Sequence, residues 1–432
     1  MTLSIPSSLS WYCAAPHTAA SNYTLPPQLL QDDYTPPSQE AELIHLIHVQ
    51  RHSKRTSVNL LPNEEFYNPP AGWNCNNIQY YNYAHGNDGS TNIQKHFGIP
   101  DWHPLKSRFW NGTCESGPLT AGGLHDAFQQ GKDLWSVYGP KGKNPIHNFG
   151  SPWPTQHNTL LRNSPEERTF QVASGLLHGM GVPDHENFKS VVMPSTLDNI
   201  VPNYVCSHAN DLRNTINAEK AWTDHIASKA DLFGTLNDVL GTANLSAWNS
   251  WIDHPFDALS SRQCNGHPLP TNPQTGKSIT QDIADQVYAE GNWEYNYIWN
   301  ASPNADEYTK YSIALLVKEL AVLMKTVQDG TNEKKLSLFV GHDGTMVRLF
   351  KTVGMPYIMW PGMGSELNFE IYKTKEKTPK YYVRTLSYGK TLNSTVKALT
   401  GSDQPAEASW APLEDVIAYL NERVPADLAS KC

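Results

Sequence analysis

Residues 41–50 form a nearly continuous apolar segment, AELIHLIHVQ, and this segment limits the possible folds more than any other part of the sequence. A strand that is apolar on both faces is typical of a parallel sheet covered by helices. Further strand patterns occur at 158–162, 336–340, 365–373 and 381–386. We therefore predict an α/β fold, with a mixed, mostly parallel central sheet flanked by helices and a smaller, mainly α cap domain.

Capping and amphipathic patterns predict helices between these strands. Ser164 before Pro165 is typical of a helix start, with serine as the N-cap and proline at the first helical position. This helix is expected to end near Gly179. Other helices are predicted at 119–138, 311–327, 345–353 and 415–423, with helical patterns around 212–240 and 279–290.

The 432-residue chain is long enough for two or three domains. Residues 1–40 are rich in Pro, Ser and Thr and are expected to form an extended arm. The α/β core is assigned to residues 41–62, 115–184 and 310–432. Residues 63–114 and 185–309 show long loops, helical patterns and few strands, so they are predicted to be cap insertions.

The charge balance argues against one class of partner. There are 33 Lys and Arg residues against 42 Asp and Glu residues, which gives a formal net charge of −9. Proteins that wrap nucleic acid present broad basic surfaces, so no nucleic-acid partner is expected. No apolar segment is long enough to span a bilayer, so no membrane contact is expected, and the oligomeric state is left open.

The six cysteines are scattered and contain no CxxC pair, which disfavours a zinc ribbon and permits up to three disulfides whose pairing stays open. N-x-S/T sequons begin at Asn22, Asn111, Asn244, Asn300 and Asn393. The first 20 residues contain no Lys or Arg and no uninterrupted apolar run, so they do not resemble a signal peptide. The protein is therefore either intracellular or a secreted protein whose leader is absent from this sequence.

Charged side chains follow three of the predicted strands at the point where each strand ends. They are Arg51, His52 and Arg55 after the first strand, Arg162 at the end of the second, and His342 and Asp343 after the strand at 336–340. Ligands of open α/β sheets bind at the carboxyl ends of the strands. If these strands are neighbours, the guanidinium and imidazole groups form an anion site suited to a phosphoryl group.

The order of these groups resembles that of the histidine acid phosphatases, the high-molecular-weight branch of the histidine phosphatase superfamily that includes fungal phytases. The family's first motif is Arg-His-Gly-x-Arg-x-Pro, and residues 51–57 read Arg-His-Ser-Lys-Arg-Thr-Ser. The family's His-Asp after a strand is matched by His342-Asp343. The resemblance covers most of residues 41–180 and 310–432, but not the cap segments.

Between these two motifs the family carries an arginine, then Ser or Thr, then Arg-Thr. Here that pattern is matched by Arg162, Ser164, Arg168 and Thr169. We expect Arg162 to hold phosphate, whereas Arg168 is expected to pair with a carboxylate on its own helix.

The resemblance implies a role for each matched residue. His52 would be the nucleophile that forms a phosphohistidine, and Asp343 would protonate the leaving alcohol. The phosphate oxygens would be held by Arg51, Arg55, Arg162 and His342. It also implies a secreted enzyme that hydrolyses small phosphomonoesters at acidic pH without a metal or an organic cofactor.

Two residues depart from the family pattern, because Ser53 replaces the glycine and Ser57 replaces the proline. Glycine allows backbone conformations and close ligand approach that serine does not, so Ser53 could narrow the pocket or shift His52. Three alternatives therefore stay open: a phytase, a catalytically impaired phosphate-binding protein, and a related enzyme diverted to other substrates. The cap segments are not notably basic, which disfavours the phytase alternative.

The histidines of the first strand have a simpler explanation than metal binding. His45 and His48 lie three residues apart, so on a strand their side chains point to opposite faces. We expect both to be buried and hydrogen-bonded, and no metal site is predicted.

Overall fold

The computed structural model describes residues 5–26, 41–68, 72–76, 80–81, 91–184, 186–201 and 204–432. The chain divides into two compact units. The smaller unit contains Met1–Cys13, Lys54–His125 and Ile226–Glu290, and the larger unit contains Ala14–Ser53, Asp126–His225 and Gly291–Cys432. Residues 185–225 and 291–309, which the sequence assigns to a cap, thus belong to the larger unit.

The larger unit is built on one mixed sheet, which confirms the predicted α/β fold. The strand order is β12-β8-β7-β1-β6-β4-β5, with β9 paired to β8. The parallel strands are β1 (Ala41–Arg51), β6 (Leu336–Gly341), β4 (Thr159–Asn163) and β5 (Ser190–Val191). The antiparallel strands are β7 (Glu366–Thr374), β8 (Tyr381–Ser387), β9 (Lys390–Thr391) and β12 (Ala411–Pro412). Strands β1 and β6 are almost wholly buried, as their apolar sequences require.

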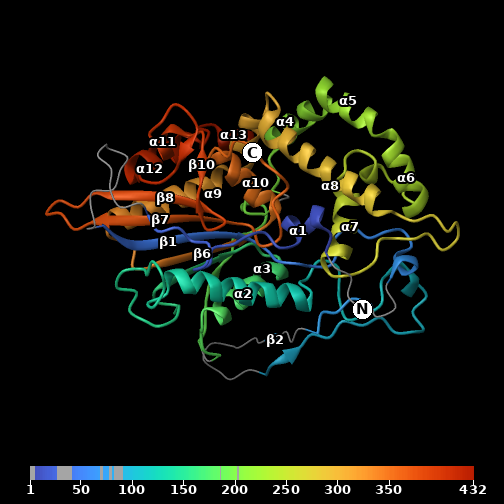
Figure 1. Cartoon of the computed structure of the whole chain (residues 1–432), viewed down its shortest axis with the longest axis horizontal. Coiled ribbons are helices and arrows are strands. Elements are labelled where there is room, and N and C mark those ends of the chain that lie inside the picture. Colours follow the sequence, from blue (N-terminus) through green and yellow to red (C-terminus); the bar gives the residue numbers. More distant parts are fainter. Residues whose placement is uncertain are drawn as a thin grey trace. The chain divides into compact units, whose positions relative to one another are not determined.

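Helices cover both faces of this sheet (Figure 1). One face carries α2 (Ala121–Tyr138) and α3 (Glu167–Gly179), and the other carries α9 (Ala305–Gln328), α10 (Asp343–Thr352) and α12 (Leu413–Glu422). Glycines let α2 and α3 approach closely, because a Cβ atom at Gly131 would lie 2.1 Å from the carbonyl oxygen of Leu176. A Cβ at Gly179 would likewise lie 2.0 Å from the carbonyl oxygen of Phe128.

The remaining helices connect or extend these layers. The larger unit also contains α4 (Ser207–Ala218), α11 (Lys397–Thr400) and α13 (Leu428–Lys431), and the smaller unit contains α1 (Ser7–Cys13), α6 (Ala230–Leu240) and α7 (Asp253–Cys264). Helices α2, α5 (Lys220–Ser228) and α8 (Gln281–Asn296) each pass from one unit into the other. Short elements complete the chain: β2 (Tyr80–Tyr81), β3 (Ile93–Gln94), β10 (Asn393–Ser394), β11 (Ala406–Glu407) and single helical turns at Glu64–Tyr67, Lys106–Arg108, Ser246–Trp248 and Tyr297–Ala301.

Two local predictions are wrong, and one helix was not predicted. The expected arm at 1–40 contains a helix, α1, in which Leu9, Tyr12 and Cys13 are buried, while residues 27–40 lie outside the described residues. Helix α3 begins at Glu167 instead of Pro165, and its N-cap is Glu166. The sequence also gave no signal for α7, whose residues 255–264 are all buried and therefore show no amphipathic period.

All six cysteines are paired, as Cys13–Cys264, Cys75–Cys114 and Cys206–Cys432. None of the helices described here combines the length and apolar character needed to cross a bilayer.

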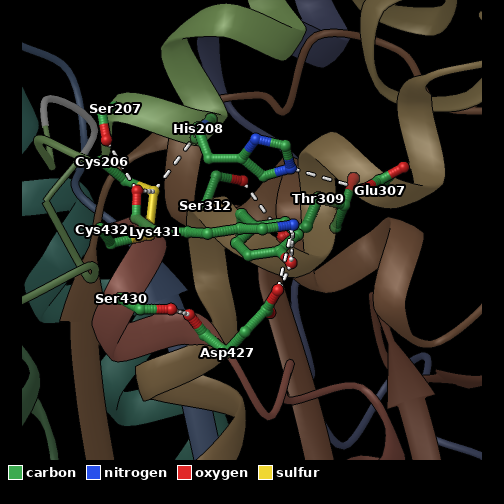
Figure 2. Close-up of a disulfide and its surroundings, with 12 residues drawn as sticks. Cys206, Ser207, His208, Glu307, Thr309, Ser312, Asp427, Ser430, Lys431 and Cys432 are labelled. Carbon is green, nitrogen blue, oxygen red and sulfur yellow. Dashed lines mark hydrogen bonds and ion pairs between the residues drawn. A yellow bond between two sulfur atoms is a disulfide. The ribbon is translucent and has the colours of Figure 1, made fainter.

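The Cys206–Cys432 disulfide fastens α13 to the start of α4 (Figure 2). Around it, the Tyr311 hydroxyl of α9 donates to Asp427 Oδ1 at 2.7 Å, and Lys431 Nζ lies 3.0 Å from Asp427 Oδ2. His208 packs edge-on against the Tyr311 ring, with the ring centroids 4.4 Å apart. The disulfide thus joins residues 226 positions apart, and the contacts of Tyr311 connect α9 to the same cluster.

Replacing both Cys206 and Cys432 by alanine is expected to lower the free energy of unfolding by about 2–4 kcal/mol, because the unfolded chain regains the freedom that the closed loop removes. Urea unfolding followed by circular dichroism measures this loss. The matched control is Ser430→Ala, which removes one hydrogen bond to the Asp427 carbonyl in the same cluster. A double variant as stable as the Ser430→Ala protein would contradict the prediction.

Candidate active site

The carboxyl ends of β1, β6 and β4 meet at one edge of the sheet. In the parallel register, Arg51 lies opposite Gly341 and Asn163 lies opposite Val340. The His52 amide donates to the Gly341 carbonyl at 3.0 Å. This pairing places the His52 and His342 rings edge-to-face, with their centroids 5.6 Å apart.

The hydrogen bonds of His52 determine which ring nitrogen can react. His52 is 2% exposed, and its Nδ1 lies 3.0 Å from the backbone carbonyl oxygen of Ser53. A carbonyl oxygen only accepts hydrogen bonds, so Nδ1 must carry the proton. In the neutral imidazole the Nε2 lone pair is then the nucleophilic one.

The second imidazole adopts the opposite tautomer. Arg168 Nη2 lies 3.3 Å from His342 Nδ1, and a guanidinium can only donate. His342 Nδ1 is therefore the acceptor, and its Nε2 donates to the Ser164 hydroxyl at 2.8 Å. Ser164, predicted from the sequence to cap α3, instead orients this histidine.

Asp343 accepts hydrogen bonds on both carboxylate oxygens. Its Oδ2 accepts from Arg51 Nη2 at 2.9 Å and from the Trp360 indole Nε1 at 3.0 Å. Its Oδ1 accepts from the Gly344 amide at 2.7 Å. The side chain of Asp343 is 20% exposed, whereas that of Arg51 is fully buried. The carboxylate can therefore exchange protons with a bound molecule or with water.

The structure does not place Arg162 where the sequence analysis expects it. The Arg162 guanidinium makes two hydrogen bonds to Asp198, at 2.7 and 2.9 Å, and its Nε lies 3.0 Å from Glu319. Its side chain is only 1% exposed. Burial lowers the pKa of Arg162, but the two carboxylates outweigh that effect and raise it overall. Arg162 is therefore held in a buried ion cluster by two acidic residues that the sequence analysis did not connect with it.

Arg168, which the sequence analysis expects to pair with a carboxylate on its own helix, makes such a pair with the N-cap residue and also lies beside His342. Its Nη1 does contact Glu166 at 3.2 Å, but Glu166 is about half exposed, and such pairs contribute little. Its Nη2 faces His342 from the first turn of α3. The Arg-Thr pair at 168–169 was the sequence signal for a phosphate ligand at this position, but the sequence analysis gave that role to Arg162.

Arg55 belongs to the smaller unit, three residues beyond His52 in the chain. Its Nη1 lies 2.8 Å from Asp257 Oδ1, and both side chains are buried. Burial alone would raise the pKa of Asp257, but Arg55 and hydrogen bonds from Ser57 and Asn59 lower it overall. The Ser57 hydroxyl donates to Asp257 Oδ2 at 2.8 Å, so hydrogen bonds fix this turn where the family has proline.

Ser53 adopts an ordinary backbone conformation. In the described part of the chain, the non-glycine residues with positive φ are Asn148 and Tyr388. Serine at position 53 therefore imposes no backbone strain that glycine would relieve. Its hydroxyl is buried and has no hydrogen-bond partner.

His45 and His48 are buried and hydrogen-bonded, which confirms the simpler explanation. His45 lies 3.0 Å from both the Lys334 carbonyl and the Ser337 hydroxyl, and burial lowers its pKa to about 4. His48 contacts the side chains of Asn368 and Gln50. Within the described ranges, no group of three or more His, Cys, Asp or Glu side chains is placed to hold a metal ion.

Comparison with known proteins adds independent information. Residues 42–387 match the model of the histidine phosphatase superfamily (branch 2). Counting factor 60 of Dictyostelium discoideum is 22% identical over 320 residues, which cover 71% of each chain.

Solved structures share the fold at low sequence identity. The phytase of Citrobacter braakii has a TM-score of 0.55 at 12% identity, covering 90% of this chain and 99% of that one. The multiple inositol polyphosphate phosphatase of Bifidobacterium longum, in complex with inositol hexasulfate, has a TM-score of 0.54 at 10% identity, covering 95% and 99%. The family match includes both β1 and β6 and the residues that follow each of them, so the chain belongs to the histidine phosphatase superfamily, branch 2.

Proposed function

We propose that this protein hydrolyses small phosphomonoesters at acidic pH through a phosphohistidine intermediate. The observation that carries the proposal is the tautomer of His52, whose Nδ1–H donates to the Ser53 carbonyl and so leaves the nucleophilic lone pair on Nε2. The family match and the absence of backbone strain at Ser53 support an active enzyme over an impaired phosphate-binding protein.

The reaction follows from these groups in two steps. His52 Nε2 forms a bond to phosphorus as the bond from phosphorus to the leaving oxygen breaks, and Asp343 gives that oxygen a proton. Water then attacks phosphorus, Asp343 takes a proton from it, and the bond to Nε2 breaks to release phosphate. Arg51 and Arg168 would hold the equatorial oxygens, where fixed cationic donors stabilise the transferring group. His342 would join them in its imidazolium form, in which Nδ1 also carries a proton to donate. We assign Arg168 this role in place of Arg162, and Arg55 is proposed as a further ligand.

A phytase is the second candidate, because the structural neighbours include phytases and an inositol polyphosphate phosphatase. The two candidates share their chemistry and differ in substrate. Relative turnover of phytate and of a simple aryl phosphate separates them.

We also propose that the protein is secreted. Three disulfides are typical of oxidising compartments. Of the five sequons, Asn111, Asn244 and Asn393 are exposed, so these are the proposed glycan acceptors.

The first test is a panel of phosphomonoesters across pH, with His52→Ala as the decisive variant. The wild type is expected to hydrolyse several of them and to incorporate radioactive phosphate that survives a denaturing, alkaline quench. His52→Ala is expected to lose both signals because no other atom can accept the phosphoryl group. His147→Ala, which changes a half-exposed histidine paired with Glu42, is the control. Wild-type activity in His52→Ala would overturn the covalent mechanism.

Asp343→Asn is expected to slow the hydrolysis of alkyl phosphates by about 10²–10⁴-fold, because the leaving alkoxide loses its proton donor. A carboxyl group ordinarily titrates near ~4, so wild-type kcat/KM should fall as pH rises above the optimum, and this decline should disappear in the variant. Initial rates between pH 3 and 8 measure both effects. Asp329→Asn, at an exposed ion pair with Lys325, should match the wild type. A wild-type optimum above neutrality would count against this role for Asp343.

Arg168 and Arg162 are expected to differ in the kind of damage that their loss causes. Arg168→Ala should lower kcat/KM by about 10²-fold or more with little change in stability, because a phosphate ligand is lost. Arg162→Met should lower the free energy of unfolding by about 3–5 kcal/mol, because Asp198 stays buried, and Glu319 partly buried, without their partner. Steady-state kinetics and urea unfolding of both variants test this assignment, and the reverse pattern would restore Arg162 as the phosphate ligand.

A further inference from the structure

The segment at 356–360 brings a tryptophan to the acidic residue of the site. Trp360 is 3% exposed, and its indole Nε1–H donates to Asp343 Oδ2 at 3.0 Å. The next residue, Pro361, accepts a hydrogen bond from Arg51 Nη1 through its carbonyl oxygen. One short segment therefore contacts both members of the Arg51–Asp343 ion pair.

Three asparagines, called here the asparagine ladder, hold this segment in place. They are Asn292 and Asn296 of α8 and Asn300 of the π-helical turn at Tyr297–Ala301. Asn292 Oδ1 accepts from the Trp360 amide at 3.0 Å, and Asn296 Oδ1 accepts from the Ile358 amide at 3.2 Å. Asn300 Nδ2 donates to the Pro356 carbonyl at 3.0 Å.

The spacing of the ladder explains why alternate residues of the segment are bound. Four residues of an α-helix rise by about 6 Å, and two residues of any chain reach at most about 7 Å. Side chains four apart on α8 and on the turn that follows it can therefore meet backbone groups two apart in the segment. Lys351 Nζ donates to Asn300 Oδ1 at 3.2 Å, which turns the Asn300 amide so that its Nδ2 faces Pro356.

A stacking contact fixes the indole ring itself. The Tyr295 and Trp360 rings are stacked, with centroids 4.1 Å apart and an interplanar angle of 20°. The asparagine ladder fixes the backbone of Trp360, and stacking on Tyr295 fixes the plane of the indole ring. The indole N–H is therefore directed toward Asp343.

We propose that Trp360 is a positioning residue for proton transfer by Asp343, held in place by the asparagine ladder. This inference rests on the proposed phosphatase function. Oδ2 of Asp343 accepts from two side-chain donors, Arg51 and Trp360, whereas Oδ1 accepts from the Gly344 amide. A carboxylate oxygen has two lone pairs, so the two donors on Oδ2 direct the transferable proton to Oδ1. As the phosphorus–oxygen bond breaks, that proton moves from Oδ1 to the leaving oxygen, and Asp343 becomes a carboxylate stabilised by both donors.

The test uses two substrates whose leaving groups differ in their need for a proton. p-Nitrophenol leaves readily as an anion, whereas glycerol leaves glycerol 2-phosphate only when its oxygen is protonated. Trp360→Phe keeps an aromatic ring on Tyr295 and removes the indole N–H. It is expected to lower kcat/KM for glycerol 2-phosphate by about 10- to 100-fold, as for the loss of a hydrogen bond to a charged group. The value for p-nitrophenyl phosphate should stay within about threefold of the wild type.

Two further variants separate positioning from folding. Asn292→Ala keeps the indole but frees the Trp360 backbone, and it should reproduce the substrate difference to a smaller degree. Trp135→Phe is the matched control, because it removes an indole N–H that donates to the Pro152 carbonyl at 2.9 Å. It should leave both substrates unaffected. If Trp360→Phe does not fold, Asn292→Ala supplies the test.

The possible outcomes are distinguishable. An equal loss on both substrates in Trp360→Phe and Asn292→Ala would mean that the segment only supports the structure, and would overturn the inference. Unchanged rates on both substrates would also overturn it. A wild type that hydrolyses p-nitrophenyl phosphate, together with either of these results, preserves the proposed function. A wild type that hydrolyses neither substrate overturns the proposed function and this inference with it.

Discussion

The parallel pairing of β1 with β6 and of β6 with β4 is the constraint on which the rest of the larger unit depends. Because three strands end at one edge of the sheet, residues that are hundreds of positions apart in sequence become neighbours there. The pairing also determines the orientation of His52, because its backbone amide continues the β1–β6 ladder by donating to the Gly341 carbonyl. The two imidazoles are thus positioned by backbone hydrogen bonds before any side-chain contact acts.

Several guanidinium groups that are buried in the sheet region are each paired with a carboxylate. Arg51 pairs with Asp343, Arg162 with Asp198 and Glu319, and farther along the sheet Arg384 with Glu370. A buried charge without a partner is strongly destabilising. Two of these carboxylates are partly exposed, Asp343 at 20% and Glu319 at 23%, and Asp343 is the one that directly follows β6 beside His342. Asp343 therefore both compensates the charge of the buried Arg51 and stays accessible for proton exchange.

The sequence predicted the fold, and it predicted which groups gather at the strand ends, for a clear physical reason. Strands β1, β4, β6, β7 and β8 were found to within a residue or two, because their apolar runs and turn signals are local. His52, His342, Asp343 and Arg51 come together because each follows or ends one of those strands. Arg162 and Arg168 could not be separated in this way. Their roles depend on Asp198 and Glu319, which come from a loop and from α9, and no local pattern links those positions.

Trp360 and the asparagine ladder are a second case that local sequence patterns could not predict. Asn292, Asn296 and Asn300 have a helical period, but polar residues at that spacing are typical of a solvated helix face. Their role becomes visible only when the segment at 356–360 lies against them, because each hydrogen bond joins a side chain of one element to the backbone of another. A two-residue motif is enough to predict the carboxylate of a proton donor. Its orientation, however, depends on rigid neighbours that come from several elements. If Asp343 has the proposed role, substitutions in α8 and in the segment at 356–360 would therefore alter catalysis without changing either family motif.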